Sequence, residues 1–231
     1  MDLGLAGRRC VVTGASRGIG RATAELLAAE GARLLLVARD GDALAAAAPA
    51  GAELLAADVT APDAGERIAA ACAQRLGGVD VLVNNAGTSS VKALDELTEE
   101  DWERQWQLNV RGPERLMRAL APRMAQEGGG RIVNVVSTSG KRPSLRNAAY
   151  SVTKAAQLSL SRTYADAWAG RGVIVNAVAP GLTASELWTG EGGLADQTVA
   201  AGGAADRDAA IAAAAARVPL GRFAEPGEIA A

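Results

Sequence analysis

The chain has 231 residues, of which 24 are basic and 26 acidic, so its net charge is −2 and its pI is about 5.4. This balance argues against nucleic acid or an anionic membrane as a partner. There is no histidine, which excludes His-dependent triads, and no metal site is predicted. Cys10 and Cys72 lack metal-like spacing and are expected to be buried, reduced thiols. With no signal-like leader and no apolar run approaching ~20 residues, the sequence predicts a cytoplasmic protein.

The first third of the chain alternates strand-like and helix-like segments. Strands are predicted over 9–13, 31–38, 53–58 and 79–83, with helices over 21–30 and 64–76. This alternation is typical of an α/β fold with a parallel sheet. After the first strand comes Gly14-Ala-Ser-Arg17-Gly18-Ile-Gly20, a turn that lets the backbone approach a pyrophosphate at a helix N-terminus. A glycine-rich turn with a purely structural role has the same composition.

A long helix is predicted next. It opens with a capping box at Thr98–Asp101, bends near Gly112–Pro113 and continues to about residue 127. Its Trp102 and Trp106 are expected in the core. Asn109 lies inside this helix, where asparagine has modest propensity, which favours a tertiary role over the alternative of an exposed side chain.

The last part of the chain completes one domain, residues 1–231. A strand ending at Ser137 precedes a helix over 148–169, and a sixth strand covers 172–178. The segment 182–218 is then rich in alanine and glycine. A long excursion after a strand's carboxyl end suits a lid over a substrate, although a plain surface helix with flexible flanks fits as well.

Tyr150 and Lys154 are four residues apart on the predicted helix and share one face. An unperturbed tyrosine pKa of ~10 is too high for proton exchange near neutrality, and a neighbouring ammonium is expected to lower it. Ser137, at the end of the adjacent strand, is placed to donate a hydrogen bond to the same substrate oxygen. The alternatives are a surface Tyr–Lys pair and a serine that serves turn chemistry.

The end of the second strand bears on cofactor choice. NAD-specific sites place an acidic residue there, but this chain has Ala38 followed by Arg39. Arg39 and Arg17 can both pair with a 2′-phosphate, so NADP(H) is expected, with NAD(H) less favoured. The alternative is that both arginines face solvent and Asp40 offsets Arg39.

Six separated motifs occur in order along the chain: Thr13-Gly14-x-x-x-Gly18-Ile19-Gly20, Asn84-Asn85-Ala86-Gly87, Asn109, Ser137, Tyr150-x-x-x-Lys154 and Pro180-Gly181. Together they resemble the short-chain dehydrogenase/reductase family, and within it the 3-oxoacyl-carrier-protein reductase-like group. The resemblance implies a Rossmann-type doubly wound parallel sheet with helices on both faces. It also implies a homo-oligomer, a dimer or homotetramer, that acts on a small-molecule carbonyl or alcohol.

The resemblance assigns a role to each matching residue. Tyr150 is the implied proton donor, Lys154 lowers its pKa and holds the nicotinamide ribose, Ser137 orients the carbonyl, and Asn109 holds a relay water. Asp58 is implied at the adenine and Thr183 at the nicotinamide amide. The full cofactor-binding set is Gly14, Ser16, Arg17, Gly18, Ile19, Gly20, Arg39, Asp58, Val59, Asn85, Ala86, Gly87, Tyr150, Lys154, Pro180, Gly181 and Thr183.

The chain ends at Ala231, just after Pro226 opens a helix. Family members continue through that helix and a last edge strand, so about 20 to 30 residues are expected to be absent. Three alternatives to an active reductase therefore stay open: an inactive fragment, a non-catalytic dinucleotide-binding regulator, and an epimerase or dehydratase of the extended branch. Lys141, Arg142 and Arg146 allow an anionic acyl-carrier or coenzyme A substrate, or simply form a solvated basic loop.

Overall fold

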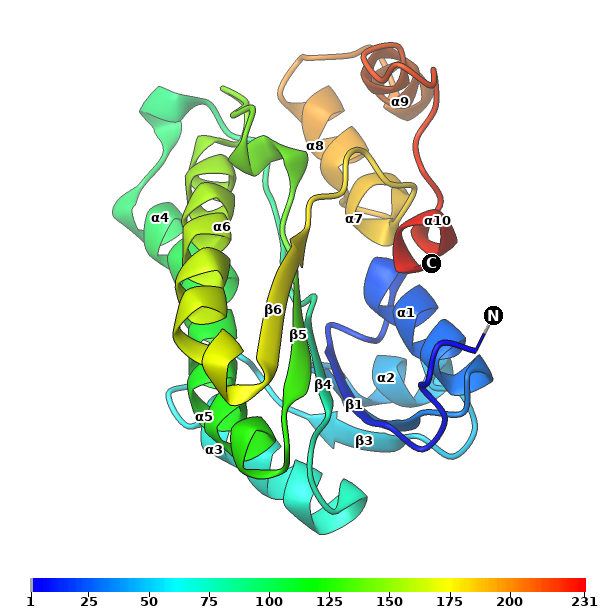
Figure 1. The fold of residues 1–231 in the computed structure, drawn as a ribbon. Helices are drawn as coiled ribbons and strands as arrows, with labels where there is room; N and C mark the ends of the chain where they lie inside the picture. The colour runs from blue at the N-terminus through cyan, green and yellow to red at the C-terminus, as the bar shows by residue number, and fades with distance from the viewer. Residues whose placement is uncertain (1) are drawn as a thin grey trace.

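A single parallel sheet organises the protein. The computed structural model describes residues 2–231 and contains six strands in the order β3-β2-β1-β4-β5-β6 (Figure 1). The strands are β1 (Arg9–Thr13), β2 (Arg33–Ala38), β3 (Glu53–Ala56), β4 (Val81–Asn84), β5 (Gly130–Val135) and β6 (Val173–Val178). All neighbouring pairs are parallel. The chain reverses its direction across the sheet between β1 and β4, which is the Rossmann topology expected from the sequence.

Helices cover both faces of this sheet, as predicted (Figure 1). The α-helices before β6 are α1 (Gly18–Ala29), α2 (Gly41–Ala47), α3 (Ala64–Ala71), α4 (Glu99–Trp106), α5 (Gly112–Gln126) and α6 (Ala148–Trp168). Val11 and Leu35 point toward α3 and α5, whereas their neighbours Val12 and Leu36 point toward α1 and α2. Both faces of the central strands are therefore buried, which explains their continuous apolar sequences.

The two cysteines lie where the sequence placed them. Cys10 is in β1, Cys72 directly follows α3, and both are buried and free. Burial raises the pKa of each thiol to about 12, so both stay protonated. The expectation of buried, reduced thiols is confirmed.

The long middle helix differs from the prediction in two ways. Its irregularity is a π-helical turn, Gln107–Arg111, which precedes Gly112–Pro113, and Pro113 simply occupies the first turn of α5. Trp106 is 41% exposed, so the expectation that it is a core residue was wrong. α4 buries the face that carries Asp101 and Gln105 instead, and Trp106 is rotated by about 100° from Gln105.

The chain beyond β6 lies past the carboxyl ends of the strands (Figure 1). It forms α7 (Glu186–Thr189), α8 (Leu194–Ala200), α9 (Arg207–Ala215) and α10 (Pro226–Ala230). Trp188 packs edge-on against Phe223 with 5.2 Å between ring centroids, and α10 packs against α1. These contacts bring the end of the segment back beside α1. None of the helices between residues 2 and 231 has the length and apolar character needed to cross a membrane.

Candidate functional site

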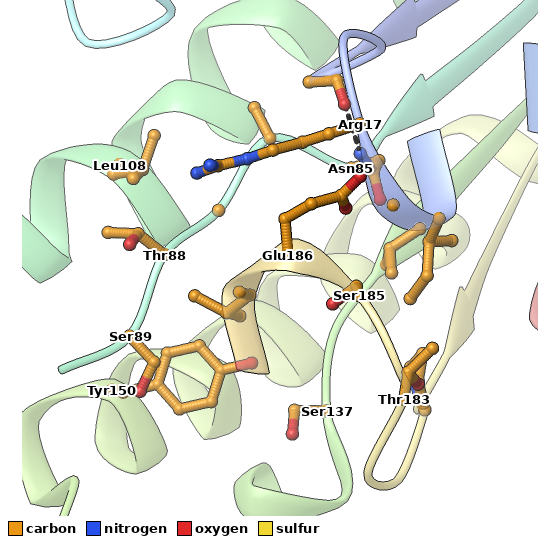
Figure 2. A pocket seen from close by; sticks show the side chains of 18 of the residues that line it. Arg17, Asn85, Thr88, Ser89, Leu108, Ser137, Tyr150, Thr183, Ser185 and Glu186 are labelled. Carbon is orange, nitrogen blue, oxygen red and sulfur yellow. Dashed lines mark hydrogen bonds between the residues drawn. The ribbon is translucent and has the colours of Figure 1, made fainter. Parts of the chain in front are cut away.

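A cavity of about 900 Å³ opens at the carboxyl ends of β1, β2, β4, β5 and β6. Open parallel sheets bind ligands at this edge, where the strand order reverses. Except for Gly20 and Asn109, every residue predicted to form the site lines this cavity. In Figure 2, Arg17 and Asn85 lie at one end of it, with Ser137 and Tyr150 at the other. The tertiary structure thus unites motifs spread over about 170 residues of sequence.

The glycine turn is locked against the loop that follows β4. The Asn85 Nδ2 donates hydrogen bonds to the carbonyl oxygens of Thr13 (3.0 Å) and Gly14 (3.1 Å). In return, the Thr13 hydroxyl accepts the backbone N–H groups of Asn85 and Ala86, both at 3.1 Å. A Cβ on Gly14, whose φ is 66°, would lie 2.9 Å from the Ala86 Cα. The close approach of these two backbones requires glycine.

The N-terminus of α1 fits a dinucleotide phosphate. No side chain caps this 12-residue helix, and its first turn contains no acidic residue. Its leading N–H groups are therefore available to an anion at the positive end of the helix dipole. Gly18 and Ile19 of this turn line the cavity. The residues present fit the pyrophosphate of the cofactor that the resemblance implies.

The adenosine end of the cavity carries no acidic residue at the end of β2. That strand ends at Ala38, which pairs in register with Ala56 of β3, and the exposed Arg39 follows. Among residues 2–231, Arg39 forms no ion pair. Asp40 instead caps α2, where its carboxylate accepts the N–H of Ala43 at 3.0 Å. Asp40 lines the same cavity as Arg39, so the choice between NADP(H) and NAD(H) stays a prediction.

Tyr150 and Ser137 face the cavity from two different elements. Ser137 follows β5, and its Oγ accepts the N–H of Ser139 at 3.1 Å. The short turn after Ser137 packs tightly on α6: a Cβ on Gly140 would lie 2.9 Å from the carbonyl carbon of Lys154. Burial raises the pKa of Tyr150, and the nearby Ser137 hydroxyl opposes this rise. The sequence-based expectation that Lys154 lowers this pKa is not met in the structure.

Lys154 lies beside the Tyr150 ring. Its Nζ lies 5.7 Å from the centroid of the Tyr150 ring, over the ring face. The ammonium donates to the carbonyl oxygen of Val135 at 3.0 Å and to the Oε1 of Gln157 at 2.9 Å. Lys154 is only 3% exposed, and burial lowers its pKa to about 7. The motif reading did not single out Gln157, because only the fold shows which side of α6 is buried.

Asn109 is fully buried in the π-helical turn between α4 and α5. Its Nδ2 donates to Gln105 Oε1 at 2.7 Å and to Thr153 Oγ1 at 3.2 Å. Within residues 2–231 its Oδ1 has no hydrogen-bond partner, and it lies 3.3 Å from where a Cβ on Gly87 would be. A buried acceptor without a partner calls for a water molecule or a ligand group. The expected tertiary role of Asn109 thus has a structural basis, and the exposed alternative is excluded.

Several residues that the motifs did not indicate also line the cavity, among them Ser89, Ser185 and Glu186. The Ser185 Cβ would lie 3.1 Å from a Cβ on Gly18, so the segment after β6 rests directly on the glycine turn. Figure 2 shows Glu186 reaching from α7 toward this turn, beside Arg17. No local sequence signal brings Ser185 and Glu186 to the cavity, since α7 meets the glycine turn only through the tertiary fold.

Two curated relatives match nearly the whole chain. The galactitol 2-dehydrogenase of Agrobacterium fabrum is 36% identical over 224 residues, which are 95% of this chain and 86% of the relative. The 3-oxoacyl-acyl-carrier-protein reductase of Vibrio cholerae is 35% identical over an alignment of 239 positions that covers 99% of this chain and 88% of the relative. The likeness to the latter group, expected from the motifs, is confirmed.

Solved structures and a family model agree with these relatives. The L-sorbose reductase of Gluconobacter frateurii, solved with NADPH and L-sorbose, superposes with a TM-score of 0.90 at 37% identity and covers 100% of this chain and 89% of its own. A xylitol dehydrogenase bound to NAD⁺ gives a TM-score of 0.90 at 28% identity, covering 98% of this chain and 90% of its own. The family model described as short chain dehydrogenase matches residues 8–192. The chain therefore belongs to the short-chain dehydrogenase family and is an oxidoreductase of alcohols and carbonyl compounds.

Proposed function

We propose that this protein reduces a small-molecule ketone or aldehyde to the alcohol, or catalyses the reverse oxidation, with NADP(H). The observation that carries the proposal is the single cavity in which Ser137, Tyr150 and Lys154 face the glycine turn of α1. When bound, the nicotinamide cofactor supplies the hydride. The chain itself supplies position, charge and the proton.

Tyr150 is the proton donor in this proposal. Its raised pKa keeps the phenol protonated at neutral pH, which suits the reductive direction. Ser137 donates a hydrogen bond to the carbonyl oxygen of the substrate and stabilises the charge that develops there. The unpartnered Oδ1 of Asn109 holds a water that returns the proton to the site.

Lys154 has three N–H donors, and two of them are engaged by Val135 and Gln157. The third is assigned to the nicotinamide ribose. Lys154 would hold this hydroxyl beside Tyr150, and the lowering of the Tyr150 pKa that the sequence suggested is proposed for the complex with cofactor.

The preference for NADP(H) rests on the end of β2. Ala38 supplies no carboxylate to repel a 2′-phosphate, and Arg39 is exposed at the cavity without an ion pair to any of residues 2–231. Relatives of this fold bind either cofactor, as the NADPH and NAD⁺ complexes show for those two proteins. The charge at this position therefore supports NADP(H).

The segment 182–218 acts as the substrate lid in this proposal. Its α7 lines the cavity and rests on the glycine turn through Ser185, while α8 contributes Leu194 to the wall. The homo-oligomeric assembly and cytoplasmic location expected from the sequence complete the proposal.

The test is Tyr150→Phe, which keeps the ring and removes the transferable proton. We expect kcat for any accepted ketone to fall at least ~10²-fold, with cofactor affinity little changed. NADPH oxidation followed at 340 nm across a panel of ketones, sugars and acyl thioesters gives the measurement. Tyr164→Phe, on the same helix but outside the cavity, is the matched control. Parent-level turnover by Tyr150→Phe would contradict the proposal.

A further inference from the structure

Gln157 is a buried polar residue beside the site to which the proposed reaction assigns no role. It lies three residues after Lys154 on α6, is 1% exposed, and accepts a hydrogen bond from the Lys154 ammonium at 2.9 Å. Burying a glutamine side chain costs free energy of desolvation, which an apolar residue of the same size would not. The position of Gln157 therefore indicates a role beyond filling space.

The reason lies in the surroundings of Lys154. Within residues 2–231 no carboxylate pairs with its ammonium: burial alone lowers its pKa, and the Tyr150 side chain faces it. The charged residues on the helices that pack against α6 have other partners. Asp101 of α4 pairs with Lys92 and Arg104. On α5, Glu114 pairs with Arg111, and Arg115 donates to Gln107. Within residues 2–231, two neutral oxygens, on Val135 and Gln157, are the acceptors for this ammonium.

The turn of α6 that carries Gln157 is itself tied to the sheet. The Ser161 hydroxyl donates to the main-chain carbonyl oxygen of Gln157 at 2.7 Å and accepts from Asn134 Nδ2 at 2.8 Å. Asn134 of β5 accepts in turn from Asn84 Nδ2 of β4, also at 2.8 Å. These four residues are at most 4% exposed. This buried hydrogen-bond network holds α6 in a fixed position against the strands. It therefore also fixes the position of the Gln157 side-chain oxygen.

We propose that Gln157 is a positioning residue that holds the Lys154 side chain in its protonated form at the active site. The inference rests on the proposed reaction, in which Lys154 must carry its charge beside the cofactor and Tyr150. A hydrogen bond to the charged form of a group favours that form, so Gln157 counteracts the effect of burial. It acts only through Lys154 and touches no reacting atom.

The test compares pH profiles of kcat/KM for ketone reduction in the parent, Gln157→Leu and Gln157→Glu. The alkaline limb, where kcat/KM falls as Lys154 loses its proton, is the part of the profile that tests the proposal. Gln157→Leu removes the acceptor and moves this limb to lower pH by about one unit, as expected for the loss of a hydrogen bond to a charged group. Gln157→Glu keeps the shape but adds a negative charge, and moves the limb to higher pH. Gln126→Leu, on the exposed end of α5, is the matched control and leaves the profile unchanged.

The proposal would be overturned if the alkaline limb of Gln157→Leu did not move, or if both variants lost the same factor in kcat/KM at every pH. Gln157 would then be a packing residue. A second readout needs no activity: in the cofactor-free protein, the pH at which stability begins to rise moves down in Gln157→Leu and up in Gln157→Glu. If the parent reduces no ketone, the proposed function fails, but this readout still decides the role of Gln157. If Gln157→Leu does not fold, the isosteric Gln157→Glu alone decides it by the direction of its shift.

Discussion

Lys154 gives the structure a measurable dependence of stability on pH. The side chain is 3% exposed and forms no ion pair with a carboxylate of residues 2–231, and burial lowers its pKa from 10.5 to about 7. Between these two values the unfolded chain binds one more proton than the folded protein, so stability rises as pH rises. The cost of burying the ammonium is fully present below pH 7 and disappears toward pH 10.5. Lys154→Met removes the titrating group while keeping a long side chain.

The magnitude follows from the shift. With the folded-state pKa at about 7 and an ordinary value in the unfolded chain, the Lys154 contribution to the free energy of unfolding increases by about 2 kcal/mol between pH 7 and pH 9. Other groups contribute in the opposite sense at higher pH. The pKa values of Cys10 and Cys72 are raised to about 12, so their ionisation in the unfolded chain lowers the free energy of unfolding above pH 9. Tyr150, whose pKa is also raised, has the same effect above pH 10. The difference between parent and variant cancels these contributions.

The assay is urea unfolding of the cofactor-free protein at pH 7, 8 and 9, for the parent and for Lys154→Met. We expect the stability of the parent relative to the variant to increase steadily with pH. Lys141→Met, on an exposed loop, should show no such trend. A difference that stays constant within the extrapolation error, or one that shrinks as pH rises, would refute the reasoning.

Two further substitutions test the cofactor end of the cavity. Arg39→Ala should raise the KM for NADPH at least tenfold more than the KM for NADH, and Ala38→Asp should reverse the preference; equal kcat/KM for both cofactors in the parent would contradict the assignment. Gly20→Ala would place a Cβ 2.3 Å from Asn85 Nδ2 and equally close to a carbonyl oxygen of the glycine turn. We expect it to lower stability by about 1 to 3 kcal/mol and weaken cofactor binding in a fluorescence titration, whereas Gly170→Ala, which faces open space, should change neither.

Local sequence patterns determined the elements and much of the site. Apolar runs predicted the six strands along the chain, and the i, i+4 spacing of Tyr150 and Lys154 placed both on one helix. The end of β2 at Ala38 was also readable, since strand length is a local feature, whereas α2 and its Asp40 cap were not predicted. Such predictions succeed because periodicity and capping depend on residues within one or two turns.

Tertiary structure decided the environment of each group. Whether the lysine charge reaches the tyrosine hydroxyl depends on burial and on Val135 and Gln157, and the sequence gives no measure of either. The π-helical turn that buries Asn109 and the path that brings Ser185 onto Gly18 were equally hidden. These features arise from packing between segments that are distant in the sequence, where the pKa of a group and the partners of its hydrogen bonds are set by which surfaces exclude water.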